Sequence, residues 1–154
     1  MSELTIRRVT SNDAADVAHL FATLGYPIQP DDVPYRLARL DAITDAVLLA
    51  IEDTGSPLGL IALHAFPIVH VAQPLALITG LVVSPDARGR GVGRSLVEAA
   101  RNWAMERGCD RLMVTSAEHR ADAHAFYPAV GMPCTGRRFA VTLSQGQSPN
   151  PAPR

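Results

Sequence analysis

Residues 88–94 read Arg-Gly-Arg-Gly-Val-Gly-Arg and lead directly into the clearest helical pattern of the 154-residue chain. The spacing of Val92, Leu96 and Trp103 predicts a helix from 91 to 107 with one apolar face. Glycines allow tight turns and close approach of a ligand to the backbone. A helix start adds unpaired amides and a positive partial charge. The sequence therefore predicts a phosphate-binding loop at this place.

The arginines of this loop strengthen the prediction. A helix start favours acidic side chains because the helix dipole is already positive there, yet Arg88, Arg90 and Arg94 add positive charge. A solvated turn would explain the glycines alone, whereas an incoming polyanion explains glycines and arginines together. A dinucleotide is disfavoured, because the Gly-x-Gly-x-x-Gly pattern counted from Gly89 ends on Arg94 and the next strand ends at 115–116 without an acidic residue.

The remaining pattern predicts one α/β (α+β) domain with a mixed sheet flanked by helices. Strands are expected at 4–9, 46–52, 58–66, 75–83, 111–115 and 138–143, and helices between 10–13 and Gly25, then at 31–40, 91–107 and 121–130. The apolar run 75–83 suits a central strand, and Gly80 within it predicts a bulge or a close backbone approach. We expect a single domain over 1–143 and a disordered, proline-containing tail over 144–154.

Composition excludes several classes of protein. The net charge of -1 gives no overall field for nucleic acid or an anionic membrane, so neither is expected as a partner. All 14 basic residues are arginine, which excludes a Walker phosphate loop and lysine Schiff-base chemistry. Cys109 and Cys134 make neither a disulfide scaffold nor a zinc site, and we expect both to be reduced and partly buried. The sequence shows no signal peptide and no long apolar run, so a cytoplasmic location is expected. No bound metal is expected.

At two places the sequence resembles the GNAT superfamily of N-acetyltransferases. Arg88, Gly91 and Gly93 fill the family's pyrophosphate-binding signature, which is Arg or Gln, two residues, Gly, one residue, then Gly or Ala. Residues 123–127, Ala-His-Ala-Phe-Tyr, followed by Val-Gly-Met at 130–132, resemble its second signature of an alanine, Phe-Tyr and an aliphatic-Gly pair. The two signatures have the separation and element order of the family, which is more specific than either alone.

The resemblance covers about 4–143 and implies an enzyme. It implies transfer of an acetyl group from acetyl-coenzyme A to a primary amine of a small molecule or peptide, by direct attack in a ternary complex. The implied fold is a three-layer domain with a mixed, mostly antiparallel central sheet, and a homodimer is left open. The alternative is a non-catalytic coenzyme A-binding regulatory module of the same fold.

The resemblance also implies a role for each matched residue. Amides of 88–93 would hold the pyrophosphate of coenzyme A, and the backbone of 81–83 would pair with the pantetheine arm like an added strand. Tyr127 would protonate the departing thiolate as the catalytic acid, and Arg120 stands where many members carry Asn and would contact a phosphate. The implied cofactor-binding residues are Leu81, Val82, Val83, Arg88, Gly89, Arg90, Gly91, Val92, Gly93, Arg94 and Arg120.

The general base departs from the family pattern. Many members carry a glutamate on the central strand, where this chain has Thr79 and Gly80, and neither residue can accept a proton from an amine. The remaining candidates are His64, His70, Glu118, His119 and an ordered water.

The region of the second predicted helix is acidic. It contains Asp31, Asp32, Asp41 and Asp45. A solvated face with a helix cap is the favoured interpretation, and a lip that attracts a cationic amine is the alternative.

Overall fold

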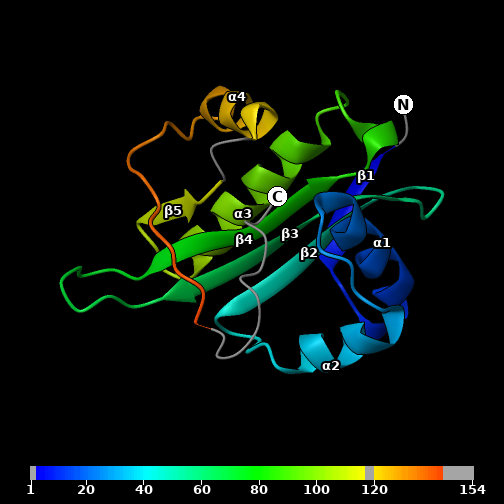
Figure 1. Ribbon diagram of the computed structural model, residues 1–154, viewed down its shortest axis with the longest axis horizontal. Coiled ribbons are helices and arrows are strands. Elements are labelled where there is room, and N and C mark those ends of the chain that lie inside the picture. The colour runs from blue at the N-terminus through cyan, green and yellow to red at the C-terminus, as the bar shows by residue number, and fades with distance from the viewer. Residues whose placement is uncertain (1–2, 117–119, 144–154) are drawn as a thin grey trace. The chain divides into compact units, whose positions relative to one another are not determined.

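The computed structural model describes residues 3–116 and 120–143. The described residues divide between Val114 and Thr115 into two compact units, and each unit is described by itself. The strands of the first unit are β1 (Leu4–Arg8), β2 (Asp45–Glu52), β3 (Pro57–Phe66), β4 (Leu75–Val83) and β5 (Arg111–Val114) (Figure 1). Its α-helices are α1 (Ala14–Leu24), α2 (Val33–Ala38) and α3 (Val92–Glu106). Its 3-10 helices are η1 (Ser11–Asp13), η2 (Pro30–Asp32) and η3 (Pro85–Ala87), and the second unit contains α4 (Ala121–Ala129).

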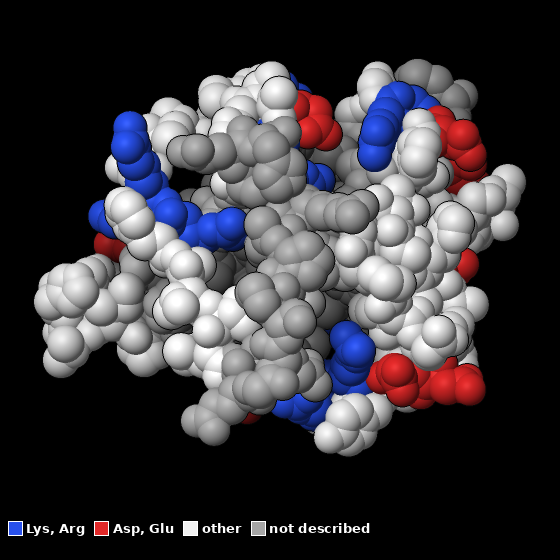
Figure 2. All heavy atoms as spheres, viewed as in Figure 1, with Lys and Arg blue, Asp and Glu red and all other residues white. Residues whose placement is uncertain are grey.

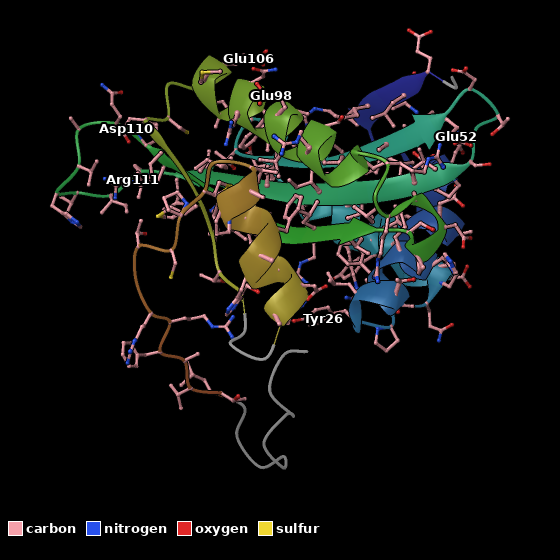
Figure 3. The ribbon with its side chains drawn as sticks, turned by 90° about the horizontal axis from the view of Figure 1, so that it is seen from above. Tyr26, Glu52, Glu98, Glu106, Asp110 and Arg111 are labelled. Atoms are coloured by element: carbon pink, nitrogen blue, oxygen red, sulfur yellow. The ribbon has the colours of Figure 1, made fainter. Side chains whose placement is uncertain are left out.

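The sheet of the first unit has the strand order β1-β2-β3-β4-β5. The first three pairings are antiparallel, and β4 pairs with β5 in parallel. The parallel pair follows from α3, because a helix must carry the chain back to the same end of the sheet. Helix α3 covers one face, while α1 and α2 lie on the opposite face (Figure 3). The predicted mixed, mostly antiparallel sheet between two helical layers is confirmed.

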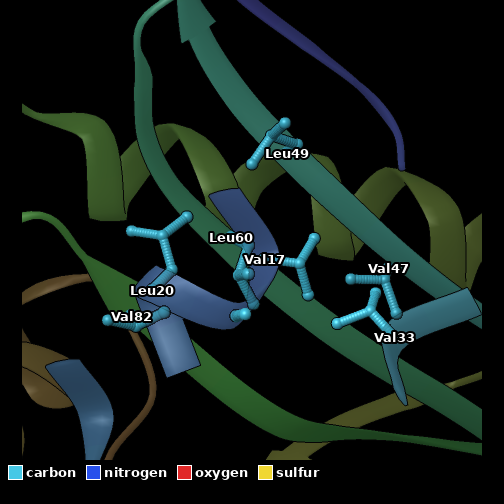
Figure 4. Packing of buried hydrophobic residues seen from close by; sticks show 8 residues of the cluster. Val17, Leu20, Val33, Val47, Leu49, Leu60 and Val82 are labelled. Atoms are coloured by element: carbon cyan, nitrogen blue, oxygen red, sulfur yellow. The ribbon is translucent and has the colours of Figure 1, made fainter. Parts of the chain in front are cut away.

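One hydrophobic core cluster lies between α1 and the sheet. Val17 and Leu20 lie three residues apart on α1, which places them on one helical face, and they pack against Leu49 and Leu60 from neighbouring strands (Figure 4). The three leucines are fully buried, and each buried side chain of this size stabilises the fold by about 1.5–3 kcal/mol. Val33 brings α2 into the same cluster. The core therefore fixes both helices on one face of the sheet.

The entry to α1 is held by a capping box and an ion pair. The hydroxyl of Thr10 accepts a hydrogen bond from the amide of Asn12, and the carboxylate of Asp13 accepts one from the amide of Thr10 at 2.8 Å. The guanidinium of Arg7 donates to both oxygens of Asp13, at 2.8 and 2.9 Å. At the other end Gly25 has φ of 104° and ends the helix. Residues 10–13 therefore hold the 3-10 turn that leads into α1, and the helix ends at the predicted Gly25.

At Gly59 the backbones of β3 and β4 come close together. A Cβ atom at this position would lie 2.6 Å from the carbonyl oxygen of Val82 and 3.2 Å from Cδ1 of Leu96 on α3. Only hydrogen fits there without movement of the backbone. Glycine at this position therefore lets α3 pack tightly where β4 ends.

The structure corrects two predicted elements. Residues 138–143 were expected to form a last strand, but the described chain after α4 has no regular secondary structure. Phe139, Val141 and Leu143 alternate as in a strand and are all exposed. A strand needs a partner for its backbone groups, and within 3–116 and 120–143 no strand pairs with this segment. The second helix is shorter than the expected 31–40, because its first turn is the 3-10 helix η2.

Several smaller expectations can also be compared with the structure. Trp103 is buried, as its spacing predicted. Both cysteines are free, Cys109 buried and Cys134 exposed, so the expected partial burial is wrong for Cys134. Within the part of the chain that the structure describes, no helix is long and apolar enough to cross a membrane. The predicted tail, 144–154, lies outside the described residues.

Replacing Asp13 with Asn is expected to destabilise the fold at neutral pH but not in strong acid. The hydrogen bond from Arg7 is the main cause that lowers the pKa of Asp13 from 3.8 to about 2, against burial, which raises it. A carboxyl group with a lowered folded-state pKa stabilises the protein above its unfolded-state pKa, and the stabilisation is lost as pH falls through the folded-state value.

The measurement is urea unfolding of both proteins at a series of pH values. The difference in free energy of unfolding should be constant above about pH 5 and shrink as pH falls from about 4 towards 2. A difference of the same size at neutral pH and near pH 2 would contradict the role of the carboxylate charge.

Candidate active site

Strand β4 changes its pairing in the middle. Ala62 of β3 pairs with Gly80, but the next residue, Leu63, pairs with Ile78, so Thr79 is an extra residue. This is a β-bulge, as predicted near Gly80. The parallel pairing with β5 ends at Ile78. From the bulge onward β5 no longer pairs with β4, and this edge of β4 can offer its backbone groups to an added strand.

The three residues beyond the bulge fit a role through their backbone. Val82 is buried in the core cluster, and Leu81 and Val83 are half-buried. Their side chains are therefore used for packing, while the backbone forms the edge that β5 has left. The prediction that 81–83 pair with a ligand remains a prediction, but the strand geometry is compatible with it.

The loop after β4 turns twice through glycine. Gly89 has φ of 77° and Gly91 has φ of 82°, and both values lie in the left-handed region that side chains disfavour. A Cβ atom at either glycine would meet nothing within 4 Å, so the space beside the backbone is open. Gly91 is the N-cap of α3 and has no side chain to occupy the first-turn amides, and no acidic residue lies in that turn. The amides of Val92 and Gly93 are therefore available for an anion.

The arginines of this loop differ in their surroundings. Arg88, Arg90 and Arg94 are exposed. The guanidinium of Arg90 forms an ion pair with the carboxylate of Glu52. Glu52 lies at the end of β2 (Figure 3). This pair ties the loop that follows β4 to the end of β2, which lies two strands away in the sheet, and the sequence did not indicate it. A phosphate contact by Arg90 would compete with Glu52.

Helix α4 of the second unit carries the predicted acid. Tyr127 is half-buried, and its ring meets the ring of Phe126 edge-on, with centroids 5.2 Å apart. Burial is the main cause that raises the pKa of Tyr127 above its usual value, Asp122 raises it further and Arg120 opposes the change. The hydroxyl therefore stays protonated at neutral pH, which a proton donor requires. Arg120 is the N-cap residue of α4, and Gly131, with φ of 84°, follows the end of the helix.

A family model described as the acetyltransferase (GNAT) family matches residues 14–132, well over half of the chain. This chain belongs to the GNAT acetyltransferase family. Aminoglycoside N(6')-acetyltransferase type 1 of Stenotrophomonas maltophilia is 32% identical over 136 residues, which cover 86% of this chain and 88% of that protein. The family and this relative confirm the predicted class of enzyme, an acetyl-CoA-dependent N-acetyltransferase.

Solved structures share the fold of this GNAT protein. An aminoglycoside 6'-N-acetyltransferase of Acinetobacter baumannii gives a TM-score of 0.79 at 23% identity, over 94% of this chain and 100% of that one. An aminoglycoside N-acetyltransferase in complex with coenzyme A gives a TM-score of 0.80 at 20% identity, over 92% of this chain and 95% of that one. The fold class predicted from the two signatures is confirmed.

The base candidates of this acetyltransferase have different environments. His64 on β3 lies with its Nδ1 atom 2.8 Å from Oδ1 of Asp45 on β2. His70 is exposed in the connection between β3 and β4. Glu118 and His119 lie outside the described residues. Sequence reasoning found His64 but not its partner, because the two residues are 19 positions apart and meet only through strand pairing.

The acidic residues of the α2 region also separate into two groups. Asp31 and Asp32 are exposed in η2. Figure 2 shows a group of acidic side chains at one edge of the face in view. Asp41 accepts hydrogen bonds from the amides of Ile43 and Thr44 at 2.7 and 3.2 Å, so it holds a turn. Among the described residues, no group of three or more His, Cys, Asp or Glu side chains could hold a metal ion.

Replacing Gly91 with Val should weaken coenzyme A binding, because a branched side chain resists a φ of 82° and would displace the first-turn amides of α3. Gly55 provides the matched control, since it has φ of 84° in the β2–β3 turn and equally open surroundings. Calorimetric titration should show binding at least about tenfold weaker for Gly91→Val than for Gly55→Val, equivalent to about 1.4 kcal/mol. Arg94→Ala should lose less, because it removes an exposed charge. Equal affinities in the two valine variants would exclude the loop as the phosphate site.

Proposed function

We propose that this enzyme transfers the acetyl group of acetyl-coenzyme A to a primary amine of a small molecule, by direct attack in a ternary complex. The observation that carries the proposal is the continuous stretch from the freed edge of β4 through the Gly89–Gly91 loop into α3. The relatives support a small-molecule acceptor, since several of them are aminoglycoside N(6')-acetyltransferases.

In the proposed complex each part of this stretch recognises one part of the donor. The amides of Val92 and Gly93 would bind the diphosphate, favoured by the helix dipole. The backbone of 81–83 would pair with the amide groups of the pantetheine arm as an added strand does. The open space beside Gly89 and Gly91 fits this use, because a ligand can approach the backbone directly.

Tyr127 would supply the proton that the departing sulfur needs, and Arg120 would contact a phosphate. The raised pKa of Tyr127 supports this role, because the hydroxyl keeps its proton at neutral pH. Nothing in this transfer requires a metal ion, since a thiolate is a tolerable leaving group with a thiol pKa of about 8.5.

A non-catalytic coenzyme A-binding module is the second candidate. It is favoured by one observation: Thr79 and Gly80 occupy the part of β4 where the family resemblance implies a glutamate base. Thiol release during incubation of the protein with acetyl-coenzyme A and a panel of amines, aminoglycosides included, separates the two. Binding of acetyl-coenzyme A without release of thiol over the whole panel would favour the module.

Acetyl-coenzyme A should raise the melting temperature. A ligand at 100 times its dissociation constant stabilises the folded state by about 2.7 kcal/mol. For a chain of this size that corresponds to a shift of roughly 5–10 °C. NAD is the control, because it shares the adenine and diphosphate but lacks the pantetheine arm. The absence of any shift or calorimetric signal at millimolar acetyl-coenzyme A would refute donor binding.

Replacing Tyr127 with Phe should slow the chemical step and leave folding and acetyl-coenzyme A affinity nearly unchanged. The substitution keeps the ring that contacts Phe126 and removes only the hydroxyl. General acid catalysis is worth about a hundredfold or more, and the tolerable leaving group argues for a loss of roughly tenfold to a hundredfold. Single-turnover rates with an identified acceptor measure this step without interference from product release. A wild-type rate in Tyr127→Phe would remove the hydroxyl from the mechanism.

A further inference from the structure

His64 and Asp45 form a fixed pair on neighbouring strands. They lie directly opposite each other in the antiparallel pairing of β2 and β3, and Nδ1 of His64 is 2.8 Å from Oδ1 of Asp45. An ionised carboxylate only accepts hydrogen bonds, so Nδ1 carries the proton and Nε2 of the neutral ring keeps its lone pair. The pair therefore presents a ring nitrogen that can accept a proton.

Asp45 is itself held in place. Its Oδ2 accepts hydrogen bonds from the amide of Asp41 at 3.0 Å and from the hydroxyl of Thr44 at 3.2 Å. Burial acts to raise the pKa of Asp45, but these bonds and the one to His64 outweigh it and leave the pKa below its usual value. The carboxylate is thus charged and held in a fixed orientation toward Nδ1 of His64.

The strand register places His64 on the face covered by α1 and α2. Every second side chain of a strand points to the same side, so Leu60, Ala62 and His64 share one side of β3. Leu60 packs against Val17 of α1 in the core. The side chain of His64 is 40% exposed, in contrast to the buried leucine. A molecule that reaches this face from solvent can therefore contact the ring.

The bulge of β4 lies next to this position. Ala62 pairs with Gly80 and lies two residues from His64, a separation of about 7 Å along the strand. A Cβ atom at Gly80 would meet Cε1 of Phe21, from α1, at 3.4 Å, so the bare side of this glycine faces the same side of the sheet. In the proposed complex, the pantetheine arm of acetyl-coenzyme A pairs with the backbone from residue 83 back to residue 81. It therefore ends near Thr79, because pairing with β5 occupies the edge from Ile78 backward.

We propose that His64 is the general base for the amine and that Asp45 is its positioning residue. This inference rests on the proposed acetyl transfer and supplies the base that Thr79 and Gly80 cannot provide. Nε2 of His64 takes one proton from the ammonium group, directly or through one water, and passes it to solvent. The freed lone pair forms the C–N bond while the C–S bond breaks and its electron pair leaves with sulfur. The nitrogen loses its second proton as the sulfur gains one through Tyr127, so one proton is released in each turnover.

A purely structural pair would behave differently. It would join β2 to β3 and stack His64 on Phe66, whose ring centroid lies 5.4 Å away at an interplanar angle of 16°. Its removal would then lower stability without a specific effect on the chemical step. The experiment must therefore measure the rate of acetyl transfer separately from folding and donor binding.

The test compares single-turnover rates in wild type, His64→Gln and His70→Gln with the same amine. Glutamine can still donate a hydrogen bond to Asp45 but cannot act as a base at neutral pH. We expect a loss of about a hundredfold for His64→Gln, with calorimetric acetyl-coenzyme A affinity unchanged. The exposed His70 is the matched control and should keep the wild-type rate. Asp45→Asn should lower kcat by a smaller factor than His64→Gln does, and a change in KM should not account for the loss. The double variant should be no slower than His64→Gln, since the two residues act as a unit.

Chemical rescue gives a second readout. Added imidazole should restore part of the rate to His64→Ala and leave wild type unaffected, which a structural role would not predict. A wild-type rate in folded His64→Gln, or no response of folded His64→Ala to imidazole, would overturn the inference while acetyl transfer by wild type still stands. Should His64→Gln not fold, the response of His64→Ala decides. If wild type binds acetyl-coenzyme A but acetylates no amine in the panel, the proposed function itself fails.

Discussion

Beyond Ile78, strand β4 keeps its pairing with β3 alone, and the candidate site depends on this single change. The bulge at Thr79 separates two parts of β4. The part before it pairs with both β3 and β5, and the part after it pairs with β3 alone. The chain must then reverse direction within a few residues to begin α3, and Gly89 and Gly91 make that turn without steric cost. The freed edge and the helix start are therefore parts of one continuous segment. The same bulge determines which residue of β4 lies beside Ala62, and therefore how near His64 lies to the freed edge of β4.

The sequence predicted the elements whose signals are local. Strand β4 has the predicted bounds, and α3 begins and ends within one residue of the prediction. Apolar periodicity and glycine positions determine such elements without reference to the rest of the chain. The strand expected at 138–143 was wrong for the opposite reason. Its alternating pattern is local, but a strand forms only when a partner takes up its backbone hydrogen bonds, and a pattern does not provide that partner.

The pairing of His64 with Asp45 could not be predicted, because it depends on register. Between Ala50 and Ile51 the pairing of β2 with β3 shifts by one, so that Leu58 is an extra residue near the hairpin turn. If the pairing continued from Ile51 and Pro57 without this shift, Asp45 would lie opposite Leu63, and His64 would point to the other face of the sheet. Thus the list of candidate bases came from residue chemistry, whereas the choice among them required the three-dimensional pairing.

Two glycines of the same hairpin illustrate how differently neighbouring positions can drift in evolution. Gly55 is confined only by its backbone angle, with φ of 84° and no atom within 4 Å of a Cβ, so asparagine or aspartate can replace it. Gly59 has no such angle, yet any side chain there meets the carbonyl oxygen of Val82 at 2.6 Å. The turn can therefore accept a substitution at position 55 at a modest backbone cost, whereas position 59 accepts only glycine without movement of the backbone. The bare backbone at Gly59 thus holds the spacing between β3, β4 and α3.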